Sequence, residues 1–435
     1  MRLPCWDRPA LVGRPRHAMA EIVTPHTRPP ADTARERARL WWSQRLFAAA
    51  WAGGTIGGLW LAVSIGGGPA GAAAVLAASL LPLALGAPLA ARLAARANRR
   101  TLLWSAPAAA AVVLLACDAG ASALGVWPIV ACAALLGVAR AVFDGATADI
   151  LHQLTAPQRR LDACRDLTAR FGAGHAAGLA GLLLVGLVAG PRGAVLLAAA
   201  LAGAGAAIAG RHHPDLDMRV AGSPPLDHAL GAGVRMVAGD RLLRRTLAVG
   251  GWGMAIATAQ ATILIVWLHD GVGLRGALVP ALLAGFVAVR LGRPLVLRLA
   301  GRARAWSLLS LAFGIQAAAA LAAYSADGSL DGAVAYALSL AAGAFLGILV
   351  TRSLRIAAPA DLAPAVGLVA GAVWALAACA GAAVAAALAT GLGLADTHLV
   401  LAALALTGAV ALAGWAAALR ARPAARLVRR SLGAR

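Results

Sequence analysis

Twelve apolar segments alternate with short polar stretches along the 435 residues of the chain. Each segment approximates the ~20 residues that an α-helix needs to cross the hydrocarbon core of a bilayer. The segments are continuous apolar runs and do not alternate residue by residue, which argues against a β-barrel. The pattern predicts an all-α integral membrane protein with about twelve transmembrane helices, six in each half, because a bilayer demands internally satisfied backbone hydrogen bonds. The predicted spans are residues 46–65, 70–89, 102–120, 126–146, 171–189, 193–209, 246–268, 277–297, 305–324, 332–350, 364–388 and 398–419.

The basic residues lie almost entirely in every second polar stretch. With both termini on one side of the membrane, 36 of the 39 basic residues fall on that side. The exceptions are Arg192 and Arg275 on the other side and Arg140 within a span. Arg290 and Arg293, near the end of the predicted span 277–297, are counted with the basic stretch that follows it. Because basic loops remain in the cytoplasm, this split predicts a multi-pass protein with both termini cytoplasmic.

These spans divide the chain into five parts. We expect a cytoplasmic N-terminal tail (1–45), a six-helix bundle (46–210), a cytoplasmic connector (211–245), a second six-helix bundle (246–420) and a basic cytoplasmic tail (421–435). Two shorter helices are also predicted, an amphipathic one over residues 31–45 and one over residues 226–245 that lies on the inner face.

One polar motif occurs twice. Residues 86–100 read GAPLAARLAARANRR, and residues 292–304 read GRPLVLRLAGRAR, 206 positions later. A motif repeated at about half the chain length predicts two structurally similar halves. In an apolar protein, such repeats are typical of a transporter whose substrate site lies where the halves meet.

Composition excludes several other classes. The chain is 61% hydrophobic, with a mean hydropathy of +0.77 and only 13% charged residues. The net charge is +21, and every basic residue that contributes to it is an arginine. These arginines are dispersed between apolar segments, whereas nucleic-acid binding needs positive charge gathered on one face. The five cysteines form no CxxC or CxxH pair, so neither a disulfide framework nor a zinc site is indicated.

Enzyme and metal motifs are missing from the sequence. It contains no HExxH, GxSxG or GxxxxGK[ST] pattern, so we expect no enzyme activity, no cofactor and no ATP-driven pump within this chain. His212 and His213, followed by Asp215 and Asp217, are alternatively a metal site or a solvated turn. Adjacent histidines point apart on a helix and the acids lack ligand spacing, which favours the turn.

Three motifs together resemble the major facilitator superfamily over residues 46–420. The stretch after the second span has a glycine and a basic cluster, although Ala95 stands where the family has aspartate. RAVFDG (140–145) and LTAPQRRL (154–161) resemble the subgroup that contains enterobactin-type and macrolide exporters. FGAGHAAGLAG (171–181) is similar to the family's antiporter glycine motif, with His175 where proline is usual.

The resemblance implies two pseudo-symmetric six-helix bundles and a secondary exporter that works by alternating access, driven by protons. Its cargo would be a small amphipathic molecule, drug-like or siderophore-like, and efflux would be by antiport. The protein would be a monomer in a bacterial inner membrane, with lipid, substrate and protons as partners and no nucleic acid. Because Ala95 and Gly301 replace the motif aspartate, a non-transporting relative acting as a sensor or partner stays open, as does an importer. The inner-gate motif residues are Gly86, Arg96, Arg99, Arg100, Gly292 and Arg302.

Polar side chains within the predicted spans are the candidate functional residues, because ionisable groups in a membrane are costly. Asp144 follows Arg140 by four positions and shares its helix face, so the two form either a coupling site or a structural ion pair. His175 is a candidate proton acceptor, or else bonds a neighbouring carbonyl.

The remaining candidates are uncharged. Gln260 and Gln316 either contact substrate or bridge helices. Trp51 and Trp252 either line a cavity or anchor helices at the interface. Glycines of the fifth span recur at small-xxx-small spacing, which favours tight helix contact. These are Gly172, Gly174, Gly178 and Gly181.

Overall fold

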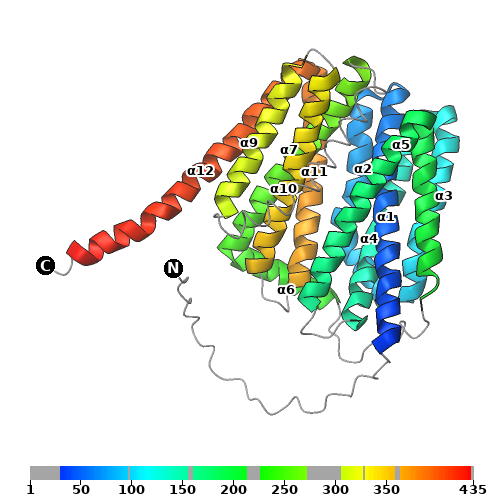
Figure 1. Cartoon of the computed structure of the whole chain (residues 1–435), viewed down its shortest axis with the longest axis horizontal. Helices are drawn as coiled ribbons and strands as arrows, with labels where there is room; N and C mark the ends of the chain where they lie inside the picture. Colours follow the sequence, from blue (N-terminus) through cyan, green and yellow to red (C-terminus); the bar gives the residue numbers. More distant parts are fainter. Residues whose placement is uncertain are drawn as a thin grey trace, which may run out of the picture.

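The computed structural model describes residues 30–96, 98–154, 160–212, 226–271, 305–326, 329–357 and 363–432, and these residues form long helices joined by short turns (Figure 1). The helices are α1 (Pro30–Ser64), α2 (Gly68–Arg96), α3 (Arg99–Leu124), α4 (Val126–Leu154), α5 (Arg160–Ala209), α6 (Leu226–Gly239), α7 (Arg241–Gly271), α9 (Ala305–Tyr324), α10 (Ser329–Ala357), α11 (Ala363–Leu392) and α12 (Leu394–Leu432). Within the described ranges, nine helical segments are long and apolar enough to cross a membrane. The all-α membrane fold predicted from the sequence is confirmed.

Glycines mark the turns between several of the apolar helices. Gly125 has φ 71° between α3 and α4, and Gly393 has φ 90° between α11 and α12. Both values lie in the left-handed region that glycine adopts without a steric cost. Gly190 has φ 68° and interrupts α5 just before Pro191, at the boundary between the predicted fifth and sixth spans. The segment Val188–Ala209, which starts beside this kink, is long and apolar enough to cross a membrane.

Several helices extend beyond the predicted spans. The amphipathic segment and the first span form one continuous helix, α1, of which Ala34–Ser64 is apolar enough to span a bilayer. At the other end of the chain, α12 continues through most of the predicted basic tail and projects beyond the neighbouring helices (Figure 1). The predicted eighth span, residues 277–297, lies outside the described residues.

The helices form two groups. Helices α1 to α5 pack against one another, and α7 packs with α9 to α12 in the second group (Figure 1). An apolar cluster joins the groups through Leu59 and Val63 of α1, Ile265 of α7 and Ala382 of α11. This cluster lies at the end of α1 that is far from Pro30, so the groups are held together at that end.

Equivalent helices approach closely in the two groups. A Cβ atom added to Gly178 of α5 would overlap the backbone of Ala49 of α1, and one added to Gly381 of α11 would overlap the backbone of Ala255 of α7. Ala255 follows Ala49 by 206 positions, the same interval that separates the two copies of the polar motif. Only glycine permits these backbone contacts.

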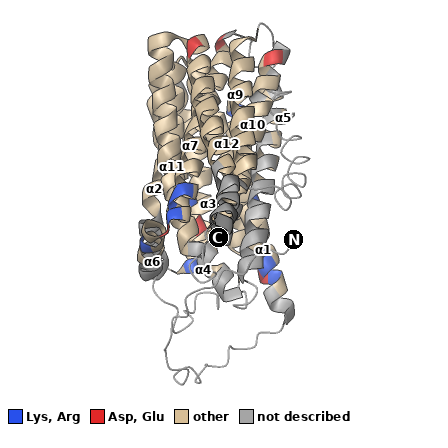
Figure 2. Cartoon of the chain, turned by 90° about the vertical axis from the view of Figure 1, so that its left-hand side faces the viewer, with Lys and Arg blue, Asp and Glu red and all other residues tan. Residues whose placement is uncertain are grey.

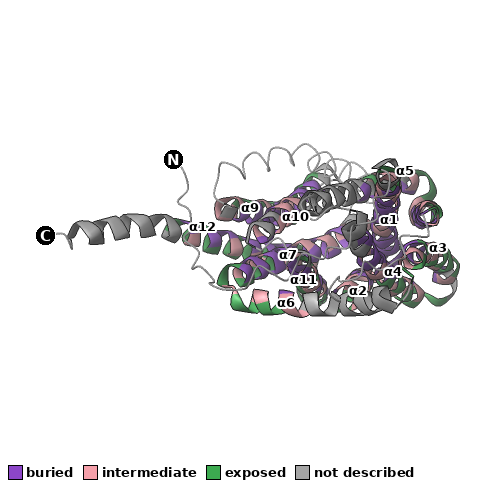
Figure 3. Cartoon of the chain, turned by 90° about the horizontal axis from the view of Figure 1, so that it is seen from below, coloured by how far each residue is buried: buried purple, intermediate pink, exposed green. Residues whose placement is uncertain are grey.

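Charge is distributed unequally between the two ends of the helices. Arginines gather at the end where α1 begins, whereas acidic residues mark the opposite end (Figure 2). Seen from the arginine-rich end, buried residues lie where helices face each other and exposed ones lie on outward faces, such as that of α6 (Figure 3). We call these the basic end and the acidic end.

Candidate functional site

An ion pair lies inside the first group of helices. Arg140 Nε donates to Asp144 Oδ2 at 2.7 Å, one turn further along α4. The Arg140 side chain is 6% exposed, whereas that of Asp144 is 39% exposed. The pair therefore combines a permanently charged, buried guanidinium with a carboxylate that the described residues leave partly uncovered.

Aromatic rings of α1 surround this guanidinium. Arg140 Cζ lies 5.9 Å from the ring centre of Trp51 and 6.0 Å from that of Phe47. Phe47 in turn packs on Phe143 at a centroid distance of 4.7 Å. The structure thus brings Trp51, which was predicted separately, to the predicted pair of Arg140 and Asp144. Cation–π contacts of this kind stabilise a cation that has left water.

Close contact between α2 and α4 fixes the position of this stretch of α4. A Cβ atom added to Gly137 would overlap the backbone oxygen of Ser79, and one added to Gly86 would lie 2.9 Å from Cβ of Ala141. Gly86 belongs to the predicted inner-gate motif, and its neighbour across the interface is next to Arg140 in sequence. Small residues therefore hold the two backbones together beside the ion pair.

The glycines of the fifth span lie against α1. Added Cβ atoms at Gly174 and Gly178 would overlap the backbone of Arg45 and Ala49, respectively, while one at Gly181 would meet only Leu197 at 3.4 Å. Gly172 and His175 lie on α5, but their side-chain environment is outside the described part of the structure. The proposed proton role of His175 stays a prediction.

Gln260 and Gln316 are fully buried within the second group of helices. Gln260 Nε2 donates to the Gln316 backbone oxygen at 2.8 Å and its Oε1 accepts from Ser339 at 2.8 Å, which links α7, α9 and α10. Gln316 Nε2 donates to the Gly253 oxygen at 3.4 Å. In this conformation both amides bridge helices, which is the second of the two roles weighed for them.

Trp252 is the other tryptophan predicted as a cavity residue. It is 43% exposed and lies on Gly408 of α12, with its Nε1 3.2 Å from the position of an added Cβ atom. Phe313 of α9 lies at the same glycine. Trp252 therefore belongs to the seam between α7, α9 and α12, far in sequence from the Arg140 site.

The inner-gate motif is described only in its first copy. Asn98 caps α3 by accepting from Thr101 N at 3.0 Å, and Arg100 Nη2 donates to the Gly210 oxygen at 2.9 Å. Arg99 starts α3 and Arg96 ends α2. Gly292 and Arg302 of the second copy lie outside the described residues.

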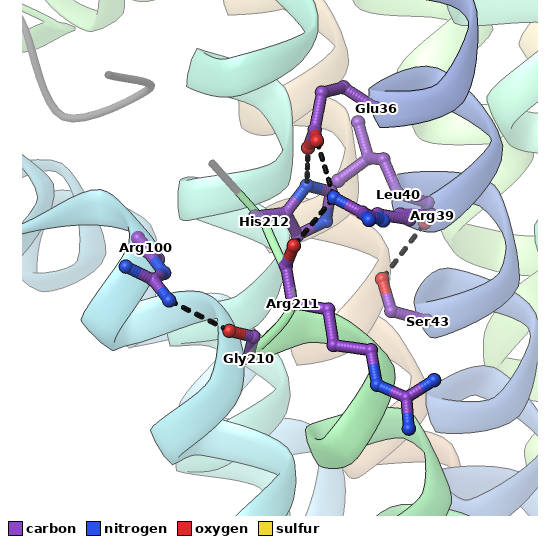
Figure 4. A network of polar contacts seen from close by, with 8 residues as sticks. All are labelled: Glu36, Arg39, Leu40, Ser43, Arg100, Gly210, Arg211 and His212. Atoms are coloured by element: carbon purple, nitrogen blue, oxygen red, sulfur yellow. Dashed lines mark hydrogen bonds and ion pairs between the residues drawn. The ribbon is translucent and has the colours of Figure 1, made fainter. Parts of the chain in front are cut away.

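A buried network of polar side chains, not predicted from the sequence, lies at the basic end (Figure 4). His212 Nδ1 donates to Glu36 Oε2 at 2.6 Å, and these residues are 1% and 5% exposed. Arg39 Nη1 donates to both Glu36 Oε1 and the Arg211 oxygen at 2.6 Å. The chain turns at His212 as expected, but the expected solvation is wrong, because the ring is buried beside α1.

Two arginines complete this network by capping the end of α5. Arg39 and Arg100 bond the carbonyls of Arg211 and Gly210, which have no partner within the helix. Burial lowers the pKa of His212 below its usual 6.5, the Glu36 hydrogen bond opposes this, and the charges of Arg39 and Arg100 lower the pKa further. A glutamate ahead of the first apolar run was the available sequence signal.

Metal ligands are not clustered in the part of the chain that the structure describes. No group of three or more His, Cys, Asp or Glu side chains there is placed to hold an ion. His212 contacts a single carboxylate, and His213 lies outside the described residues.

Solved structures of transporters have the same fold. No protein-family model matches the chain. No curated protein matches it either. The nucleoside transporter NupG is similar with a TM-score of 0.68 and 13% identity, over 87% of this chain and 98% of that one.

Two peptide-transporter structures give comparable values. A POT family transporter in complex with 5-aminolevulinic acid has a TM-score of 0.66 and 11% identity, over 88% of this chain and 96% of that one. The POT family transporter PepTSo has a TM-score of 0.61 and 14% identity, over 90% and 99%. The chain therefore has the major facilitator fold, and the similar structures are transporters rather than enzymes.

Proposed function

We propose that the protein is a proton-coupled secondary transporter of a small amphipathic molecule. In this proposal the two groups of helices rock against each other and open a central pathway alternately to each side of the membrane. The observation that carries the proposal is the Arg140–Asp144 pair, a buried charge and a partly exposed carboxylate on a span of a transporter fold.

The chemistry of the pair suits coupling. Arg140 stays protonated at any physiological pH, so its burial is stabilised only while a partner supplies negative charge or π electrons. Asp144 supplies that charge when ionised and loses it on taking up a proton. Protonation of Asp144 therefore weakens the bond to Arg140, and a substrate can exchange with the proton at this carboxylate.

The surroundings of the pair indicate how such an exchange reaches the helices. Arg140 contacts Trp51 and Phe47 on α1, and α1 lies backbone to backbone on α5 through Gly178. A change in the pair thus acts directly on α1 and, through it, on α5. Aromatic rings beside a carboxylate suit a substrate with an apolar body and a polar or cationic group.

We further propose export, as the enterobactin- and macrolide-type motifs imply, in an inner membrane with the basic end in the cytoplasm. The clustering of arginines at the end where α1 begins supports this orientation. Uptake is the alternative, and the nucleoside and peptide transporters of like fold keep it open. The transport assay described next therefore decides between export and uptake.

Flux into proteoliposomes tests the proposal. Purified protein is reconstituted and exposed to a pH gradient of either sign with ethidium, uridine or a dipeptide as probe. We expect proton-driven movement of at least one probe, loss of that movement with a protonophore, and loss in Asp144→Asn.

The matched control is Asp118→Asn, which breaks an Asp–Arg contact at the acidic end, where Asp118 lies 3.7 Å from Arg192. This variant should retain flux. Probe flux that does not depend on the pH gradient and is unchanged in Asp144→Asn contradicts coupling at this carboxylate. Absence of all movement by folded protein favours the non-transporting alternative.

A further inference from the structure

A basic and aromatic cluster lies at the periphery of the second group of helices, at the basic end. Arg245 Cζ lies 4.5 Å from the ring centre of Trp415, and that ring packs on Trp306 at 4.4 Å. The three residues come from the start of α7, the second half of α12 and the start of α9. Figure 1 shows α9 and α12 at the outer edge of the group, where lipid would surround the protein.

Arg245 has a cationic side chain but no acidic partner among the described residues. Its nearest acid in the sequence, Asp240, instead accepts hydrogen bonds from the backbone amides of Leu242 and Leu243 at 2.6 and 3.1 Å. The neighbouring Arg244 donates to the Ala238 oxygen. Arg245 is half-buried. A half-buried charge without a counter-charge is costly, so an anion from outside the chain would stabilise it.

The tryptophans indicate where this charge lies in the membrane. Trp306 and Trp415 are half-buried, and such residues gather at the headgroup level of bilayers. Arg241 precedes Arg245 by one turn, is exposed, and places a second positive charge on the same helix face. Two arginines at headgroup depth match the phosphate of a lipid.

The same helix face continues into an apolar surface. Trp252 follows Arg245 by seven residues, two turns along α7, and lies 43% exposed on Gly408 of α12. The seam between α7, α9 and α12 therefore presents cations at the membrane surface and an exposed ring deeper in the hydrocarbon. This order of charge and apolar surface is that of a phospholipid.

We propose that this seam binds an anionic phospholipid of the leaflet at the basic end, with its phosphate on Arg245 and Arg241 and an acyl chain along Trp252. Arginine suits this role, because its planar guanidinium bonds phosphate through two N–H groups while its face stacks on an aromatic ring. A zwitterionic lipid carries its own cation and gains less from the site.

Thermal unfolding of the full-length protein in detergent tests this site. The midpoint is followed as dioleoylphosphatidylglycerol or dioleoylphosphatidylcholine is added, and the half-effective lipid concentration is measured. We expect phosphatidylglycerol to stabilise the wild type at lower concentration than phosphatidylcholine. Arg245→Gln should raise the half-effective concentration of phosphatidylglycerol about fivefold, the effect of removing one arginine near an anionic surface.

The matched control is Arg192→Gln, which removes the same charge at the acidic end, where Arg192 is 58% exposed. This variant should behave as wild type. If Arg245→Gln does not fold, Arg245→Lys retains the charge without the planar fork and should lose part of the preference. Equal stabilisation by the two lipids, an unchanged half-effective concentration in the Arg245 variants, or an equal shift in Arg192→Gln overturns the proposal. Stabilisation by glycerol phosphate alone overturns the assignment to a lipid.

Discussion

Glu36 and His212 lie 176 positions apart in the chain, and their side chains form a buried hydrogen bond of 2.6 Å where α5 ends beside α1. The residues that leave the first group of helices are thereby tied to its first helix. Arg39 strengthens the tie, since it bonds both the Glu36 carboxylate and the Arg211 carbonyl. The connector to α6 thus starts from a fixed point.

This pair predicts a loss of stability on acidification. The pKa of His212 is lower in the folded protein than its usual value of 6.5, mainly because of burial, so the folded state binds fewer protons than the unfolded state. The resulting stabilisation is fully present above pH 6.5 and is lost as the pH falls from there towards the folded pKa. We expect the unfolding midpoint of the wild type to fall between about pH 7.5 and 5.5, around the histidine range.

The His212→Gln variant provides the comparison, because glutamine donates a hydrogen bond to Glu36 and does not titrate. Its midpoint should fall less than that of the wild type over the same interval. An identical acid-induced drop in both proteins would rule out His212 as the source.

The buried amides predict a stability effect without a transport effect. Gln260→Leu removes the donor to the Gln316 oxygen and the acceptor for Ser339, so two buried polar groups lose a partner. We expect a loss of about 1 kcal/mol in the free energy of unfolding, the scale of hydrogen bonds between membrane helices. Probe preference in proteoliposomes should stay unchanged. An altered preference at unchanged stability would instead assign Gln260 to the substrate pathway.

The contact between α1 and α5 predicts intolerance of a single methyl group. Gly178→Ala places a Cβ atom on the backbone of Ala49, so we expect a loss of about 1 to 3 kcal/mol from overpacking. Gly203→Ala on the same helix is the control, since nothing lies within 4 Å of its added Cβ atom. The control should be neutral or slightly stabilising, because alanine favours helix. Equal thermal midpoints in the two variants would argue against the tight contact.

The sequence predicted those features that depend on local pattern. Apolar runs located the spans, and the Gly190–Pro191 turn fell between two of them. The spacing of Arg140 and Asp144 placed them on one helix face, where the structure shows their ion pair. Both features follow from helix periodicity alone.

The features that were missed depend on contacts between distant segments. Glu36 has basic neighbours and precedes the apolar run, so its sequence context indicates a solvated tail, and only the fold brings His212 to it. Residues 31–45 are polar, so the sequence did not predict that they form one continuous helix with the first span, as they do in α1 (Pro30–Ser64). The choice between bridging and substrate contact for Gln260 needed the position of α9.

Alternating access itself is tested most directly by the distance between the acidic ends of α1 and α7. Nitroxide labels are attached to cysteines that replace Ser64 and Asp270, both exposed in the structure, in a variant that lacks the native cysteines. Double electron–electron resonance then reports the distance between the two labels. We predict two distance populations whose ratio changes between acidic and alkaline pH, and a ratio that no longer responds to pH in Asp144→Asn. A single population that is the same at every pH would contradict the account.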